Sequence, residues 1–340
     1  MTSPANVSPF LDPLEKLLSV HGTPAVVRAV EAGDDVGNAR QAWIESGFAD
    51  LLMPEASGGA GLSLRTADDL LRTCARHLLP WPLDATMVVR AVFAAIGMAV
   101  PDGFVAIAPQ TSIDVDGRIL CRGVPDGAAA DWILAATPAG AMLVPVREHR
   151  SEAVFRGGAV ATDVFWHAQP AGTTPVPREM DWMAIGACLM ATRIAGAMER
   201  LLEMTLAHAS TRSQFGKPLA AFQAIQQQLA VMAEQVAAAR MAASIGMLAD
   251  GIEADPLRAA IAKARTSEAV VAVTSIAHGV HGAIGIAAEF DLQLYTRRLH
   301  AWRLAYGTER RWHGVVGRAL LAAEGPVLDA IVLRAAPPAA

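Results

Sequence analysis

Long helical stretches joined by short polar loops dominate the chain beyond Pro177, and they constrain its fold more than any other feature. Asp181 can cap the first of these helices. The next helix carries an apolar stripe at i, i+4, i+7 and i+11, formed by Ile225, Leu229, Met232 and Val236. Three further helices are predicted, the first starting at Asp255-Pro256 and the others covering residues 292–303 and 308–323. Helices of this length and pattern favour an antiparallel four-helix bundle.

The loop between the first two of these helices reads Arg212-Ser-Gln-Phe-Gly-Lys-Pro-Leu-Ala-Ala-Phe-Gln223. Arg212 offers a forked donor that suits a diphosphate, and Phe215 can lie against an aromatic ring system. Gly216 permits a close approach of the backbone. Taken singly, such residues are more often a solvated arginine, a core aromatic or an exposed helix residue. Together, between two long helices, they are typical of a loop that contacts a ligand.

The first hundred residues carry apolar positions at helical spacing, over residues 13–19, 24–32, 39–46 and 63–77. From Phe104 to about Val164 the pattern changes to short apolar segments. Turn signals separate these segments, at Asp116-Gly117, Pro125-Asp126-Gly127, Pro138-Ala-Gly140 and Gly157-Gly158. This pattern predicts a small antiparallel β domain inside a chain that is otherwise mainly α-helical.

Composition argues against several classes of protein. Of the 340 residues, 53% are hydrophobic, but charged residues such as Arg90 and Arg193 interrupt the apolar runs, so no membrane span is predicted. The N-terminal sequence lacks the pattern of a secretory signal, which makes the cytoplasm the expected location. A net charge of -5 argues against a nucleic-acid surface. The nine histidines form no metal motif, and His278 and His281 are assigned to a helix end. Free buried thiols are expected at Cys74, Cys121 and Cys188.

The stretch from Arg212 to Gln223 resembles the sequence between the first two long helices of the C-terminal domain in acyl-CoA dehydrogenases, which are flavoenzymes. A second segment resembles the N-terminal loop of that family, and it reads Gly-Phe-Ala-Asp-Leu-Leu-Met-Pro-Glu-Ala-Ser-Gly-Gly-Ala-Gly-Leu62. Leu79-Pro-Trp-Pro-Leu83 resembles a variant in heteromeric members, especially those of steroid side-chain breakdown. The resemblance implies an N-terminal helical domain, a reduced β domain and a C-terminal bundle that contacts flavin and carries the subunit interface, over residues 1–103, 104–176 and 177–340.

The resemblance also indicates where the reaction's base should lie. Residues 281–290 resemble the family's glycine-rich stretch, and Gly307-Thr308 matches the Gly-Thr of the catalytic motif. This register places Tyr306 where the catalytic glutamate belongs. A phenol of pKa about 10 is ionised in only roughly one molecule in a thousand at pH 7, so Tyr306 is expected to be an inactive packing residue. Some relatives carry the base on the second long helix, but residues 239–246 contain no carboxylate.

In this family the flavin site is shared between subunits. The middle domain of one subunit holds the isoalloxazine ring, and the neighbour's loop contacts the ADP portion of FAD. Here the chain runs directly from Phe104 to Ser112, without the loop that hydrogen-bonds the flavin ring and the thioester region. The residues that contact the ADP portion of FAD are retained better than those that hold the isoalloxazine ring. The resemblance therefore implies FAD contacts from Arg212, Gln214, Phe215, Gln223, Gly282, Gly307 and Thr308.

The leading hypothesis is a subunit of a heteromeric acyl-CoA dehydrogenase that desaturates the α,β bond of an acyl-CoA thioester. A partner dehydrogenase would carry the glutamate, and an electron-transfer flavoprotein or a similar acceptor would reoxidise the FAD. Two alternatives stay open. One is a self-sufficient homo-oligomeric dehydrogenase with an unusual base. The other is a non-enzymatic helical assembly subunit.

Overall fold

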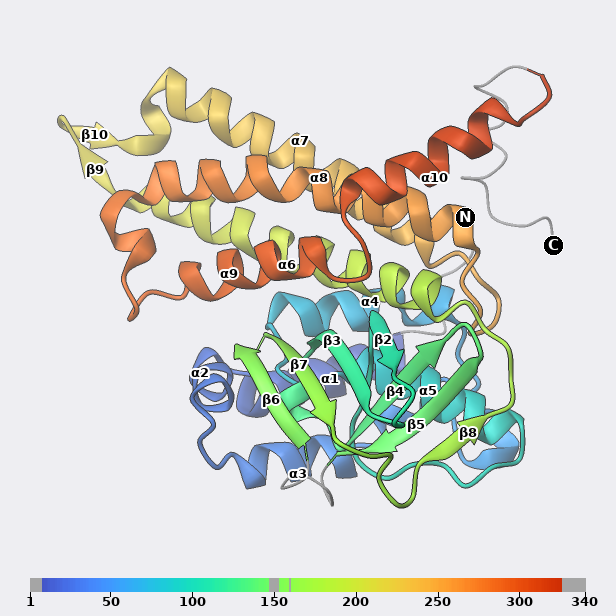
Figure 1. Ribbon diagram of the computed structural model, residues 1–340. Coiled ribbons are helices and arrows are strands. Elements are labelled where there is room, and N and C mark those ends of the chain that lie inside the picture. Colours follow the sequence, from blue (N-terminus) through green and yellow to red (C-terminus); the bar gives the residue numbers. More distant parts are fainter. Residues whose placement is uncertain (1–7, 147–152, 159, 326–340) are drawn as a thin grey trace.

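The computed structural model describes residues 8–146, the backbone of residues 153–158, and residues 160–325 (Figure 1). In Figure 1 the C-terminal helices lie across one side of the molecule, and the strands and N-terminal helices lie on the other. The first seven residues, on which the expectation about a secretory signal rests, lie outside the described residues.

Helices make up the described N-terminal part of the chain. Thr23 caps the second helix through its side chain, which accepts a hydrogen bond from the Val26 amide, and Ser63 forms a capping box with Thr66. The structure also has a helix that the sequence did not predict, α5, whose residues are almost all buried, so it lacks an amphipathic pattern. The elements are α1 (Ser8–His21), α2 (Pro24–Ala32), α3 (Gly37–Glu45), η2 (Phe48–Asp50), η3 (Glu55–Ser57), α4 (Leu64–Arg76) and α5 (Leu83–Ala95).

The middle of the chain forms two four-stranded sheets, in the orders β1-β4-β5-β8 and β2-β3-β7-β6. Buried residues from both sheets, such as Ile133 and Val164, share one apolar cluster. The prediction of a purely antiparallel unit was wrong in one place, because β1 pairs with β4 in parallel. The strands are β1 (Val105–Ile107), β2 (Gln110–Ile113), β3 (Ile119–Pro125), β4 (Trp132–Thr137), β5 (Gly140–Pro145), β6 (Ala153–Gly158), β7 (Ala161–Trp166) and β8 (Thr174–Val176), with η4 (Gly127–Ala129) after β3.

The remaining helices pack into the predicted bundle. Asp181 accepts a hydrogen bond from the Ala184 amide at the start of α6, and Asp255 accepts from two amides at the start of α8. Pro256 occupies the first turn of α8. The elements are α6 (Trp182–Thr211), β9 (Ser213–Gln214), β10 (Lys217–Pro218), η5 (Leu219–Ala221), α7 (Gln223–Gly246), α8 (Pro256–His281), η6 (Gly282–Ile286), α9 (Leu292–Leu304) and α10 (Glu309–Leu321).

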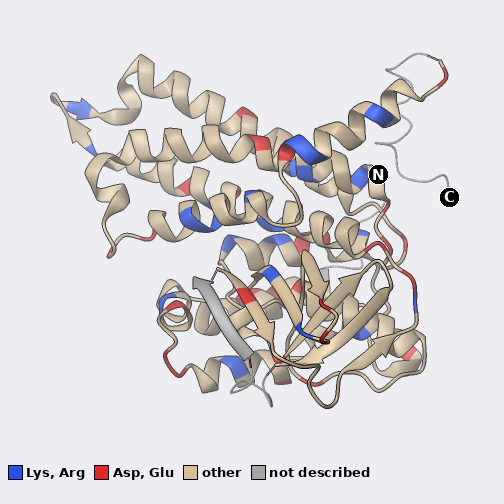
Figure 2. Ribbon diagram, viewed as in Figure 1, with Lys and Arg blue, Asp and Glu red and all other residues tan. Residues whose placement is uncertain are grey.

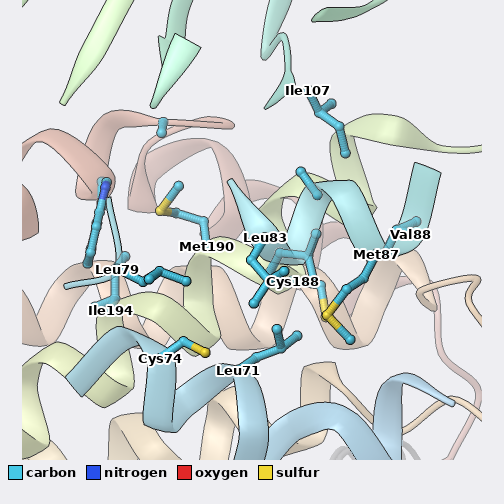
Figure 3. Close-up of a cluster of buried hydrophobic side chains, with 14 of the residues drawn as sticks. Leu71, Cys74, Leu79, Leu83, Met87, Val88, Ile107, Cys188, Met190 and Ile194 are labelled. Atoms are coloured by element: carbon cyan, nitrogen blue, oxygen red, sulfur yellow. The ribbon is translucent and has the colours of Figure 1, made fainter. Parts of the chain in front are cut away.

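Helix α6 connects the three groups of elements, because its first half is buried nearly all round. Figure 3 shows part of this core, where side chains of α4, α5 and α6 meet Ile107 of β1. All three cysteines are buried and free, as expected from their spacing. The core therefore joins the bundle, the N-terminal helices and the sheets, and it fixes the position of every element around Ile107.

One helical stretch, Pro256–Ile286, meets the length and hydropathy of a membrane span, with a mean hydropathy of 1.6. It contains α8, which packs against α6, α7 and α10 and buries the side chain of Lys263. The central helix of a bundle meets the same criterion, and the position of α8 between other helices favours this interpretation.

Candidate functional site

The loop singled out from the sequence forms a tight hairpin at the end of the bundle. Ser213–Gln214 pairs with Lys217–Pro218, and Phe215 and Gly216 form the turn with φ values of +51° and +81°. Positive φ is costly for a bulky residue, yet Phe215 adopts it and leaves 94% of its surface exposed. Neither the strain nor the exposure helps this chain to fold alone. Both are expected where an aromatic ring meets a ligand or another subunit.

The polar candidates of this loop are also exposed. Arg212 caps the C-terminus of α6 through its backbone amide, which donates to the His208 carbonyl. Within the part of the chain that the structure describes, the Arg212 guanidinium has no hydrogen bond or ion pair. Gln214 and Gln223 are exposed beside it. An unpaired guanidinium next to an exposed aromatic ring fits a diphosphate joined to a flat ring system, which is the chemistry of FAD.

Gly282 lies at the same end of the bundle. It follows the last residue of α8, has a φ of +63°, and has no neighbouring atom within 4 Å of the place where a Cβ would be. His281, the residue before it, stacks on His208 of α6 with 4.3 Å between ring centroids. The ends of α6 and α8 are therefore adjacent. The structure brings together five of the predicted cofactor residues, namely Arg212, Gln214, Phe215, Gln223 and Gly282.

The other two candidates lie elsewhere. Gly307 and Thr308 follow α9, whose 13 residues span about 20 Å at 1.5 Å per residue. Figure 1 shows their loop, between α9 and α10, far from the β9–β10 hairpin. Gly307 has a φ of +95°, and a Cβ there would lie 2.6 Å from Cδ of Arg311, which is a local reason for glycine. Within one chain, these two residues do not lie beside Arg212.

Tyr306, at the position of the expected glutamate, is 5% exposed. Its hydroxyl donates a hydrogen bond of 2.7 Å to the Ile107 carbonyl. Its ring covers Gly186 of α6 so closely that a Cβ on that glycine would lie 2.1 Å from Cε1 of the ring. Burial, and then the proximity of Asp84, raise the pKa of the phenol well above its usual value. A phenol that is protonated and already donating cannot accept a proton from a substrate.

A buried ion cluster that the sequence analysis missed lies beside Tyr306. The guanidinium of Arg193 on α6 donates to Asp84 on α5, with 2.7 Å between Nε and Oδ2, and also to Asp126. All three side chains are buried. Burial alone would lower the pKa of Arg193, but the two carboxylates raise it, so the arginine stays charged. Asp126 occurs in a Pro-Asp-Gly turn signal, and only its burial in the folded chain distinguishes it from an exposed turn residue.

These side chains leave almost no free space. The cavity that remains between them has a volume of about 10 Å³ and is lined by residues including Ile107, Gly186, Arg193 and Tyr306. A volume of this size holds one water molecule at most. No acyl chain can enter while Tyr306 occupies this position.

The second possible base position also lies apart from Tyr306. Residues 239–246 belong to α7, and the described residues that line the space around Tyr306 come from α5, α6, β1 and the neighbouring loops instead. Gly246 contacts α6 on another side, where its carbonyl accepts a hydrogen bond from the Cys188 thiol. The helix that faces Tyr306 is α6, through Gly186.

Comparison with known proteins decides the family. Residues 177–321 match the profile of the acyl-CoA dehydrogenase C-terminal domain. Acyl-CoA dehydrogenase IpdE2 of Mycobacterium tuberculosis (strain ATCC 25618 / H37Rv) is 31% identical over 305 residues, which cover 88% of this chain and 92% of that protein. This chain belongs to the acyl-CoA dehydrogenase family. The resemblance drawn from the loop after α6 is thereby confirmed.

Two further members of the acyl-CoA dehydrogenase family help to place the chain. Acyl-CoA dehydrogenase FadE34 of the same organism is 31% identical over 319 residues, which cover 85% of this chain but only 44% of FadE34. In fold, the chain is similar to a subunit of the ChsE4-ChsE5 complex from Mycobacterium tuberculosis, with a TM-score of 0.77 at 19% identity over 95% of this chain and 99% of the other. The mainly helical acyl-CoA dehydrogenase fold with a small β portion is therefore confirmed.

Proposed function

We propose that this chain is the subunit without the base in a heteromeric acyl-CoA dehydrogenase, where a partner subunit carries the glutamate. The observation that carries this proposal is the closed site at Tyr306. The hydroxyl of Tyr306 donates a hydrogen bond to the Ile107 carbonyl, and its ring covers Gly186. The remaining cavity holds one water molecule at most. A chain that can neither admit a thioester nor accept its proton at this position needs another subunit for the reaction.

The contribution of this chain to the cofactor would come from the β9–β10 hairpin and the end of α8. Arg212 would bond the diphosphate of FAD held mainly by the partner, Phe215 would pack against its rings, and Gly282 would allow close approach. Bound FAD would supply the acceptor for the hydride that leaves the β-carbon of the substrate. Gly307 and Thr308 belong to the closed site and would contact a cofactor only if a second one lay there.

The outer face of the bundle suits a partner subunit. Val231 and Met241 on α7 and Val271 on α8 are exposed, and Figure 2 shows few charged residues along these two helices. Exposed apolar side chains on helices with few charges are consistent with an interface. The comparison with FadE34 also supports a partner subunit. The match covers only 44% of FadE34, so FadE34 is long enough to contain a second unit of this size. We also propose the three-unit division at residues 103 and 176.

The substrate class and location are part of this proposal. The Tcur3481-Tcur3483 steroid acyl-CoA dehydrogenase has a similar fold, with a TM-score of 0.74 at 22% identity. This agrees with the Leu79–Leu83 segment, which resembles a variant in family members of steroid side-chain breakdown. We propose a steroid side-chain thioester as the substrate, an electron-transfer flavoprotein or similar acceptor, and a cytoplasmic location.

A self-sufficient enzyme is the weaker alternative. The carboxylates that approach the closed site are Asp84 and Asp126, and both are bonded to Arg193. Releasing either one would leave an uncompensated charge in the core. For the same reason Tyr306→Glu is not expected to create activity in the isolated chain, since it would add a third carboxylate to the cluster and leave no room for the thioester.

The decisive experiment is to express the chain with the dehydrogenase encoded beside it, if one is present, and to count flavins per assembly. We expect the complex to bind FAD and to bleach when acyl-CoA thioesters are added without oxygen, while this chain alone does neither. Arg212→Gln should lower the flavin content of a complex that still assembles. Rapid bleaching by the isolated, FAD-supplemented chain would refute the proposal.

A further inference from the structure

A stacked pair of histidines lies at the proposed cofactor contact. His208 on α6 and His281 on α8 stack with 4.3 Å between centroids and 25° between planes. His281 is 5% exposed and also contacts Phe290, with 5.4 Å between centroids. Arg212 follows His208 by one helical turn, and Gly282 follows His281 directly. The pair is therefore next in sequence to the two groups that would contact the diphosphate.

The hydrogen bonds of His281 define its neutral tautomer. Its Nδ1 lies 2.8 Å from the Ala277 carbonyl, and because a carbonyl only accepts, Nδ1 carries the hydrogen. The other nitrogen, Nε2, is buried and has no hydrogen-bond partner among the described residues. Buried polar atoms normally have partners, so an orphaned nitrogen at a ligand contact indicates a partner that arrives with the ligand.

The charged or titratable neighbours that shift the pKa values of the two histidines, among the described residues, are Arg212, His278 and the histidines themselves. Burial lowers the pKa of His281 most, the hydrogen bond with the Ala277 carbonyl raises it, and the proximity of His208 and His278 lowers it. Burial and then Arg212 lower the pKa of His208. His278 is held by Thr296 of α9, with 3.0 Å between Nε2 and Oγ1. The pair is neutral near pH 7 without a ligand, and a bound anion would provide the negative charge that it lacks.

We propose that His208 and His281 form part of the binding site for the diphosphate. Binding of the anion is coupled to protonation, because the pair takes up one proton from solvent when the anion binds. His281 would take this proton on Nε2, and no other bond would form or break. The inference rests on the proposed function, because the anion is the diphosphate that Arg212 contacts. His281 is thus a positioning residue that makes cofactor affinity depend on pH.

ADP-ribose is a suitable probe because both phosphates of this diester stay ionised from about pH 5.5 to 7.5, so any pH dependence comes from the protein. Calorimetry on the complex with its partner subunit, in buffers of different ionisation enthalpy, measures the protons taken up. We expect uptake approaching one proton and an affinity that rises up to about tenfold for each pH unit downward. His281→Gln should bind with no pH dependence. His281→Asn provides the same test if His281→Gln does not fold.

A matched control separates this pair from other histidines. His300→Gln alters a histidine of α9 outside the stack and should keep the proton uptake. Wild-type binding that is equally tight at both ends of the pH range, with no uptake, would overturn the proton link and leave the flavin contact standing. Undiminished binding by the complex with Arg212→Gln, or no binding by the wild-type complex, would refute the contact itself and this inference with it.

Discussion

The phenol of Tyr306 donates a hydrogen bond to the backbone carbonyl of Ile107, with 2.7 Å between the two oxygens. This bond joins the loop before α10 to the first strand, across a sequence separation of 199 residues. The same residue accepts a bond on its own carbonyl from Trp312 Nε1 at 2.9 Å. Tyr306 therefore fastens the bundle to the sheets at the position that the resemblance assigns to the base.

Removing that hydroxyl should weaken the fold and leave catalysis by the complex unchanged. Tyr306→Phe deletes one buried hydrogen bond, so the free energy of unfolding should fall by about 1–2 kcal/mol in urea titrations. Tyr295→Phe is the matched control, since its hydroxyl also donates at 2.7 Å to a carbonyl, that of Arg76. A complex that loses turnover with Tyr306→Phe but not with Tyr295→Phe would show that the phenol takes part in the chemistry.

The two tyrosines of the chain should both resist ionisation while it is folded. Burial raises the pKa of Tyr295 to about 12 and raises that of Tyr306 further. The folded chain thus holds these protons at a pH where an unfolded tyrosine, with a pKa near 10, loses its own. The free energy of unfolding should therefore fall as pH rises above about 10. Ultraviolet absorbance of tyrosinate should appear only with unfolding, and a signal near pH 8 would contradict the buried state of Tyr306.

The buried cluster around Arg193 should be costly to break from one side. Arg193→Met leaves Asp84 and Asp126 facing each other without a positive charge, so the chain should lose about 3–5 kcal/mol of stability. Adding Asp84→Asn and Asp126→Asn should restore most of that loss, because the remaining groups are then neutral. Chemical denaturation of the single and triple variants measures the difference. If the single variant is as stable as the wild type, the ion cluster has no structural role.

The turn at Phe215 should show opposite effects on folding and on assembly. Phe215→Gly suits the φ of +51°, so the isolated chain should be as stable as the wild type or more stable by up to about 1 kcal/mol. The same change removes the exposed ring, so co-purification with the partner or its flavin should drop. Gly216→Ala tests the effect of backbone strain alone, because it strains the turn and leaves the exposed ring of Phe215 in place. An unchanged assembly with Phe215→Gly would remove this residue from the proposed contact.

Most of the helical bundle could be predicted from the sequence, because its caps and stripes are local signals. Asp181 caps the helix that it was expected to cap, and a helix starts at Asp255-Pro256 as predicted. The stripe through Leu229 and Met232 faces the core. Helix α5 escaped because burial on all sides removes the apolar and polar alternation that marks a helix. The parallel pairing of β1 with β4 escaped because strand direction depends on contacts distant in sequence.

The candidate site was predictable only in part. The hairpin residues occur within one continuous motif, so Arg212 and Phe215 could be found together. The closed site could not be found in this way, because its charged residues, Asp84, Asp126 and Arg193, come from three distant segments. None of these segments contains a sequence motif that marks its charged residue as part of a site. The match of Gly186 to the ring of Tyr306 depends on shape, which no single segment of sequence records.

Gly186 and Tyr306 also restrict how this protein can evolve. Any side chain at Gly186 would collide with the tyrosine ring, and a carboxylate at position 306 would enter a core that already contains two. A lineage with this pair cannot regain a base at either position by one substitution without repacking its neighbours. Under the proposed function, this packing would make dependence on a partner subunit easier to keep than to reverse.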